Sequence, residues 1–128
     1  MAIQGMNHFT VLTHDLQATR DFYIGILGLT DGYRPDLGFP GSWLYVGDQA
    51  VLHIIAGRKL PEEPGGVLDH MAFSASDLKA VTAKLKSRGI DYILRRQNES
   101  RTWQLFCHDP SGAKVELDFA ASEEGPAA

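Results

Sequence analysis

The sequence predicts an α+β domain built from two βαβββ modules in tandem, residues 5–57 and 67–120. Each half of the chain contains one stretch with helical spacing of apolar residues among stretches with the alternation of β-strands. The halves are also in register, because Asn7-His8 and Asp15-Leu16 correspond to Asp69-His70 and Asp77-Leu78 at a shift of 62 (70 − 8 and 77 − 15). An internal duplication accounts for both observations.

The first module is expected to begin with a strand over residues 6–12. Residues 13–15 offer caps for a helix, and Gly28 is a suitable stop for it. A strand through Tyr33 follows, and residues 43–55 read as a hairpin about a Gly-Asp-Gln turn. The module is therefore predicted to place its helix between its first and second strands.

A polar linker over residues 58–66 separates this module from the second one, in which the same pattern returns. Its strand, helix and three further strands are expected over residues 67–73, 76–89, 90–94, 103–107 and 113–119. The last strand follows a tight turn at residues 109–112, and its alternation places Lys114, Glu116 and Asp118 on one face. Residues 121–128 read as an acidic tail.

Four candidate metal ligands occupy corresponding positions of the two modules. His8 and His70 fall on the first strands, and His53 and Glu116 on the last strands at a shift of 63 (116 − 53). Three imidazoles and one carboxylate form a competent ligand set for Zn, Fe, Mn, Ni or Co. We therefore expect one divalent transition-metal ion per chain, with His53 either a fourth ligand or a wall of the site. Such an ion stabilises an enolate or alkoxide on a chelated substrate.

Composition excludes several classes of partner. A net charge of −4 argues against nucleic acid, which requires a basic surface. No apolar run approaches the roughly 20 residues of a membrane span. The single cysteine, Cys107, fits a reducing compartment. We expect a cytoplasmic protein that acts on a small molecule and binds neither nucleic acid nor a membrane.

Several segments together resemble the vicinal oxygen chelate superfamily, which includes glyoxalase I, fosfomycin- and bleomycin-resistance proteins and extradiol dioxygenases. The matching segments are residues 7–10, 22–29, 69–73 and 109–116. The resemblance implies paired modules whose sheets curl around a metal. It makes His8, His70 and Glu116 ligands and places His53 at the position of a fourth. Members of this length commonly form homodimers, with the site between modules of the two chains.

The same resemblance implies an enzyme that binds an oxygenated substrate by chelation, as a lyase, isomerase or transferase. Glu116 is then a catalytic residue as well as a ligand, and Thr10 joins it because fosfomycin-modifying transferases share that threonine. The residues expected to border the substrate cleft are basic or aromatic. They are Arg95, Arg96, Arg101, Trp103 and Phe106.

Two alternatives stay open at this point. One is an Fe(II)-dependent dioxygenase of the same superfamily, although Phe106 stands where the extradiol signature has a tyrosine, and phenylalanine donates no hydrogen bond. The other is a metal-free protein that sequesters a drug, as bleomycin-resistance proteins do. The acidic chain suits a cationic drug, whereas ligand-type residues at symmetric positions favour a metalloenzyme.

Overall fold

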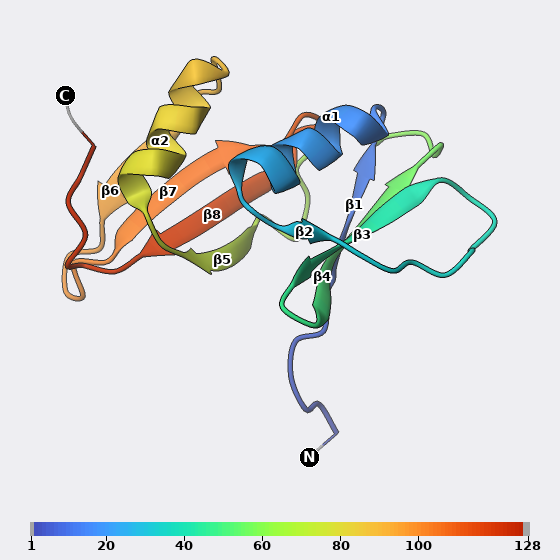
Figure 1. Ribbon diagram of the computed structural model, residues 1–128, viewed down its shortest axis with the longest axis horizontal. Helices are drawn as coiled ribbons and strands as arrows, with labels where there is room; N and C mark the ends of the chain where they lie inside the picture. The colour runs from blue at the N-terminus through green and yellow to red at the C-terminus, as the bar shows by residue number, and fades with distance from the viewer. Residues whose placement is uncertain (1, 127–128) are drawn as a thin grey trace. The chain divides into compact units, whose positions relative to one another are not determined.

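The computed structural model describes residues 2–126, which divide into two compact units between Glu62 and Glu63. Each unit contains one four-stranded mixed sheet with helix on one face, as the ribbon shows (Figure 1). The α+β class and the two βαβββ modules predicted from the sequence are confirmed. Within the described residues, no helix combines the length and apolarity that a membrane crossing requires.

The two sheets have the same topology. The first is formed by β1 (Phe9–Thr13), β2 (Thr30–Asp31), β3 (Gly41–Val46) and β4 (Gln49–Ala56), in the order β1-β4-β3-β2. The second is formed by β5 (Met71–Ala75), β6 (Ile93–Arg96), β7 (Trp103–His108) and β8 (Lys114–Phe119), in the order β5-β8-β7-β6. In both sheets the first strand pairs in parallel with the last, and the other pairings are antiparallel. The matching topology supports the internal duplication.

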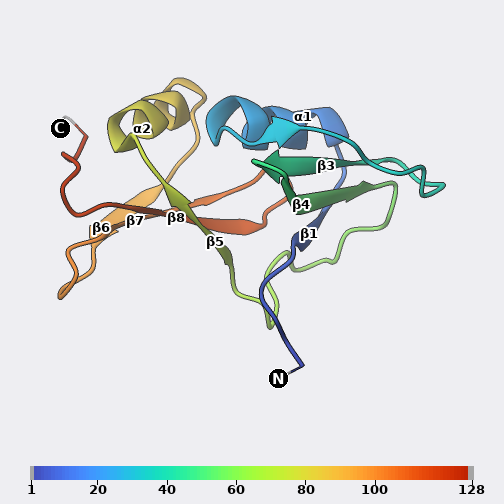
Figure 2. The same cartoon turned by 60° about the horizontal axis from the view of Figure 1, so that its bottom comes forward.

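The helix of the first unit differs from the expected continuous α-helix. An α-helical turn, α1 (Leu16–Arg20), continues as a π-helix, η1 (Asp21–Ile26), and both lie over the sheet in Figure 2. Two adjacent aromatic side chains, Phe22 and Tyr23, are both buried there with their rings edge to face. The apolar spacing in the sequence does not distinguish this π-helix from a continuous α-helix.

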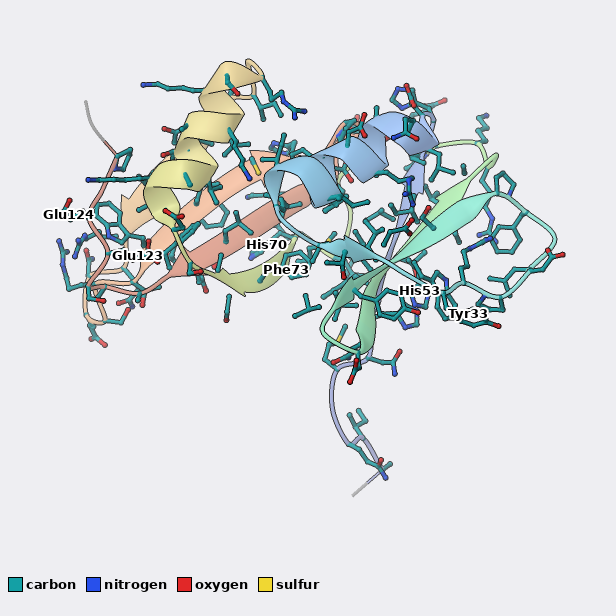
Figure 3. The ribbon with its side chains drawn as sticks, viewed as in Figure 1. Tyr33, His53, His70, Phe73, Glu123 and Glu124 are labelled. Carbon is teal, nitrogen blue, oxygen red and sulfur yellow. The ribbon has the colours of Figure 1, made fainter. Side chains whose placement is uncertain are left out.

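The Asp15 cap is confirmed, because its carboxylate accepts a hydrogen bond from the Ala18 amide at 3.0 Å. At the corresponding position of the second unit, Asp77 has left-handed backbone angles (φ 68°) and does not cap α2 (Leu78–Ser87) with its side chain. The carboxylate of Glu123 does so instead, accepting from the Asp77 and Leu78 amides at 3.1 and 2.7 Å. Figure 3 shows Glu123 beside this end of α2. The tail therefore belongs to the fold of the second unit.

An ion pair joins the helical segment of the first unit to its sheet. The Arg20 guanidinium donates to both Asp31 carboxylate oxygens at 3.1 and 2.9 Å, and to the Ser42 hydroxyl at 2.7 Å. The hydrogen bond from Arg20 lowers the pKa of Asp31. The stabilisation from Asp31 is therefore fully present above the ordinary carboxyl pKa of about 3.9 and is lost as the pH falls through the lower folded-state value.

We expect Asp31→Asn to lower the free energy of unfolding at pH 7 by less than about 1 kcal/mol, because the Asp31 side chain is 57% exposed to solvent. The difference from the wild type should shrink below about pH 4. Urea unfolding at pH 7 and pH 3 measures it, with Asp48→Asn in the exposed β3–β4 turn as the control. A deficit that stays constant down to pH 3 would assign the effect to packing rather than to charge.

Candidate metal centre

In each sheet the candidate ligands lie on the face opposite the helix, which we call the ligand face. Pairing between the first and last strands brings them together. Thr10 on β1 pairs with His53 on β4, and Ala72 on β5 pairs with Glu116 on β8. His8 and His70 each precede the paired residue by two positions, so the alternation of extended chain puts them on the same side. Both histidines come directly before their strands, which begin at Phe9 and Met71 and not at residues 6 and 67 as predicted.

In the second unit, His70 and Glu116 are in direct contact. The His70 Nε2 atom lies 3.0 Å from Glu116 Oε1, and the Glu116 side chain is only 9% exposed. On the other side of the ring, His70 Nδ1 lies 2.8 Å from an Asp69 carboxylate oxygen. The hydrogen bond from His70, and then the charge of Lys114, lowers the pKa of Asp69. Asp69 is therefore an acceptor, and His70 Nδ1 is the atom that carries the hydrogen.

This assignment leaves an electron pair on Nε2 of a neutral His70, directed at the Glu116 carboxylate. Two acceptors facing each other at 3.0 Å repel, so either a second proton on His70 or a cation must lie between them. The spacing suits a metal ion. Two metal–ligand bonds of about 2.1 Å at about 90° separate their donor atoms by about 3.0 Å. His70 and Glu116 therefore fit adjacent positions around one transition-metal ion.

Two further side chains on this ligand face contact Glu116. The sequence did not identify either of them as a site residue. Gln104 on β7 donates a long hydrogen bond of 3.5 Å to Glu116 Oε2. Asp118 lies two residues beyond Glu116 on β8. Its burial, together with the hydrogen bond to Glu116 and the charge of Glu116, raises the pKa of Asp118 to about 6. The alternation of β8 places Asp118 beside Glu116, but only the burial distinguishes it from a solvated carboxylate.

In the first unit, His53 is held in a stack of rings. Its imidazole lies nearly parallel to that of His8, with centroids 3.7 Å apart and planes at 12°, and to the Trp43 indole, at 4.0 Å and 10°. Burial, and then the proximity of His8, lowers the pKa of His53, so its ring stays neutral further into the acidic range. Figure 3 labels His53 on this sheet. Neutral imidazole is the form that binds a metal.

The stack constrains how His8 and His53 can act together. The electron pair of an imidazole nitrogen lies in the ring plane, so two parallel rings do not direct their electron pairs at one point. His53 must leave the stack with Trp43 to bind the same ion as His8. His8 itself is oriented as His70 is, because Asn7 Oδ1 accepts from its Nδ1 at 2.7 Å and leaves Nε2 free. The residue before each histidine thus selects the same ring nitrogen as the ligand atom.

Within residues 2–126, no three histidine, cysteine, aspartate or glutamate side chains gather closely enough to form a metal site. The structure shows two pairs of the predicted ligands, one in each unit. Of the other predicted catalytic residues, Thr10 lies on the ligand face of the first sheet, as the partner of His53.

The residues predicted to border the substrate cleft divide between the two faces of the second sheet. Arg95 and Phe106 lie on the ligand face, because Arg95 pairs with Gln104 and Phe106 pairs with Glu116. Arg96 and Trp103 pair with each other on the opposite face, where the guanidinium lies 4.0 Å from the indole. Arg101 lies in the β6–β7 turn with a positive φ of 62°. The alternation of β6 separates Arg95 from Arg96, although they are neighbours in sequence.

Comparison with known proteins identifies the fold and the family. The chain is 31% identical to "Glyoxylase I 4" of Arabidopsis thaliana over 123 residues, which cover 90% of this chain and 70% of the relative. It is 30% identical over 118 residues to the glutathione transferase FosA of Serratia marcescens, with 90% and 80% covered. The fold also matches a mutant of the Listeria monocytogenes fosfomycin resistance protein FosX, solved with Mn(II) and a dihydroxypropylphosphonic acid. That match has a TM-score of 0.74 and 19% identity, and it covers 92% of this chain and 93% of FosX.

A family model matches residues 5–117, which is most of the chain. The resemblance recognised in the sequence is thereby confirmed. The chain belongs to the Glyoxalase/Bleomycin resistance protein/Dioxygenase superfamily.

Proposed function

We propose that this protein is a metal-dependent enzyme that chelates an oxygenated small molecule and stabilises negative charge developing on it, as a lyase, isomerase or transferase. The observation that carries the proposal is the contact of His70 Nε2 with Glu116 Oε1, with His70 Nδ1 already committed to Asp69. A bound divalent ion would supply Lewis-acid chemistry at this position. The protein's own contribution is to hold the donors on stiff strands and to fix the tautomer of each histidine.

His70 and Glu116 provide two of the proposed ligands, and His8 provides the third. His53 is retained as the fourth donor on condition that its ring rotates away from Trp43; otherwise it is a wall that orients His8. A homodimer in which the modules of two chains complete the site is part of the proposal. Light scattering at micromolar concentration tests the assembly, and a monomer would contradict it.

Elemental analysis of the protein purified without an affinity tag tests metal binding. We expect about one transition-metal ion per chain, removable by a chelator and restorable by Zn, Mn, Fe, Ni or Co. Protein that retains no metal after loading with each of these ions in turn would overturn the proposal. In that case, calorimetric titration of a bleomycin-type drug into the metal-free protein would test sequestration.

Oxygen uptake separates the proposed chemistry from that of a dioxygenase. Phe106 pairs with Glu116 on the ligand face and offers no hydrogen-bond donor to a bound oxygen species. We expect protein loaded anaerobically with Fe(II) to show no oxygen uptake coupled to product when it is mixed with catechols or 2-oxo acids. Uptake with stoichiometric product would assign the protein to the dioxygenases.

A further inference from the structure

The ligand face of the second sheet carries two cations that flank one aromatic ring. The Arg95 guanidinium lies 5.3 Å from the centroid of the Phe106 ring, and the Lys114 ammonium lies 5.3 Å from the same centroid. The His70 ring packs edge to face against Phe106 at 5.9 Å. Phe106 therefore brings both cations into the neighbourhood of the proposed metal ligand. Nothing in the sequence singled out Lys114, which lies two residues before Glu116 on β8.

The contacts of the Arg95 side chain within residues 2–126 orient its guanidinium but use only one of its hydrogen-bonding nitrogens. Its Nε atom donates to Gln104 Oε1 at 3.2 Å, and Gln104 in turn donates through Nε2 to Glu116. Because a guanidinium is only a donor, the amide oxygen of Gln104 must face Arg95 and its nitrogen must face Glu116. In the described part of the chain, the two terminal nitrogens of Arg95 have no hydrogen-bond partner. Their edge is available for an oxyanion, which guanidinium binds with two parallel hydrogen bonds.

Lys114 is only partly neutralised by its surroundings. Its ammonium lies 3.5 Å from an Asp69 carboxylate oxygen, a loose pair between two partly exposed side chains. Three carboxylates, those of Asp69, Glu116 and Asp118, share this face with the two cations, so the metal-free face carries a net negative charge. A divalent ion bound to Glu116 reverses this balance. Electrostatic attraction for an anion therefore arises only once the metal is in place.

From this arrangement we infer that the substrate carries a carboxylate in addition to the oxygens that chelate the metal, and that Arg95 and Lys114 bind this carboxylate over the Phe106 ring. The inference rests on the proposed metal site at His70 and Glu116 and defines the substrate class of that site. Arg95, Lys114 and His70 all lie within 6 Å of the Phe106 ring centre, so the substrate that contacts them is expected to be compact. A 2-hydroxy dicarboxylate has this form, since one end chelates and the other remains anionic.

Malate and lactate form a matched pair of probes, because both chelate through a hydroxyl and a carboxylate while only malate has a second carboxylate. Calorimetric titration into the Mn(II)-loaded protein should show malate binding about tenfold more tightly than lactate. Arg95→Met and Lys114→Met should each reduce this preference severalfold when it is measured in Mn(II)-loaded protein. Arg88→Met at the end of α2 is the control, because it removes the same charge from an exposed position on the helix, and it should keep the preference.

The outcomes separate the two proposals. Failure of the wild-type protein to bind Mn(II) or any other divalent transition metal would overturn the metal site and this inference together. Mn(II) binding without a preference for malate in the wild type would overturn the inference alone, and this comparison needs no variant to fold. A preference that survives in both Arg95→Met and Lys114→Met, or that is lost equally in Arg88→Met, would also overturn it.

Discussion

Replacing His70 by alanine is expected to lower the affinity for a divalent transition metal by at least about 100-fold. Loss of an indirect partner of a metal ligand typically costs 10- to 100-fold, and loss of the ligand itself costs more. The substitution removes Nε2, which lies 3.0 Å from Glu116 Oε1, and leaves a carboxylate that is only 9% exposed without its neighbour. Competition with a chromophoric chelator measures the affinity of wild type and variant under the same conditions.

His108→Ala is the matched control for this experiment. His108 ends β7 and pairs with Lys114, so it shares the second sheet with His70 but is exposed and lies outside the contact with Glu116. Its replacement should leave the metal affinity unchanged within about threefold. Equal losses in both variants would show that the effect is not specific to His70. Unchanged affinity in His70→Ala would show that the assignment of His70 as a ligand is wrong.

Replacing Glu123 by alanine is expected to lower the free energy of unfolding by about 1–2 kcal/mol, the range of a lost helix N-cap. The Glu123 carboxylate accepts hydrogen bonds from two amides at the start of α2, and its backbone carbonyl accepts from the Trp103 indole at 2.8 Å. Alanine retains the carbonyl and removes the cap. Asp77, at the N-cap position, makes no capping hydrogen bond with its own side chain. Urea denaturation followed by circular dichroism measures the loss.

Glu124→Ala removes the same charge one residue further along. Glu124 forms an ion pair with Lys79 at 2.7 Å, but their side chains are 82% and 57% exposed. Such a pair contributes little, so the control should lose much less stability than Glu123→Ala. If the two variants are equally stable, the Glu123 contacts do not hold α2 in place and the tail is dispensable to the fold.

The strand pattern and the candidate pairs were predictable because both depend on local periodicity. Side chains of a strand alternate between its faces, so His8 and Thr10, or Glu116 and Asp118, must share a face wherever the strand goes. The duplication then identified equivalent positions in the two modules. The topology common to both sheets confirms that reading of the fold. Whether the four residues bind one ion stays a prediction.

The contacts that adjust each side chain were not predictable from these patterns. The stack of His53 between His8 and Trp43 depends on the pairing of β4 with strands on both of its sides. The separation of Arg95 from Arg96 follows from alternation once β6 is known to be a strand, but the strand predicted from the sequence, residues 90–94, ended before both arginines. The partly buried Asp118 carboxyl became distinguishable only when the sheet had formed around it.

The sequence by itself determined the order of the strands and helices, the equivalence of the two modules and the face on which each candidate ligand lies. These properties follow from apolar spacing and from residues close together in the chain. Only the tertiary structure decided that Glu123 caps a helix that begins 45 positions earlier. It also decided that Phe106 contacts Arg95, Lys114 and His70. Both arrangements join segments that are distant in sequence. Their contacts arise from the closure of long loops and from strand register, which no local pattern encodes.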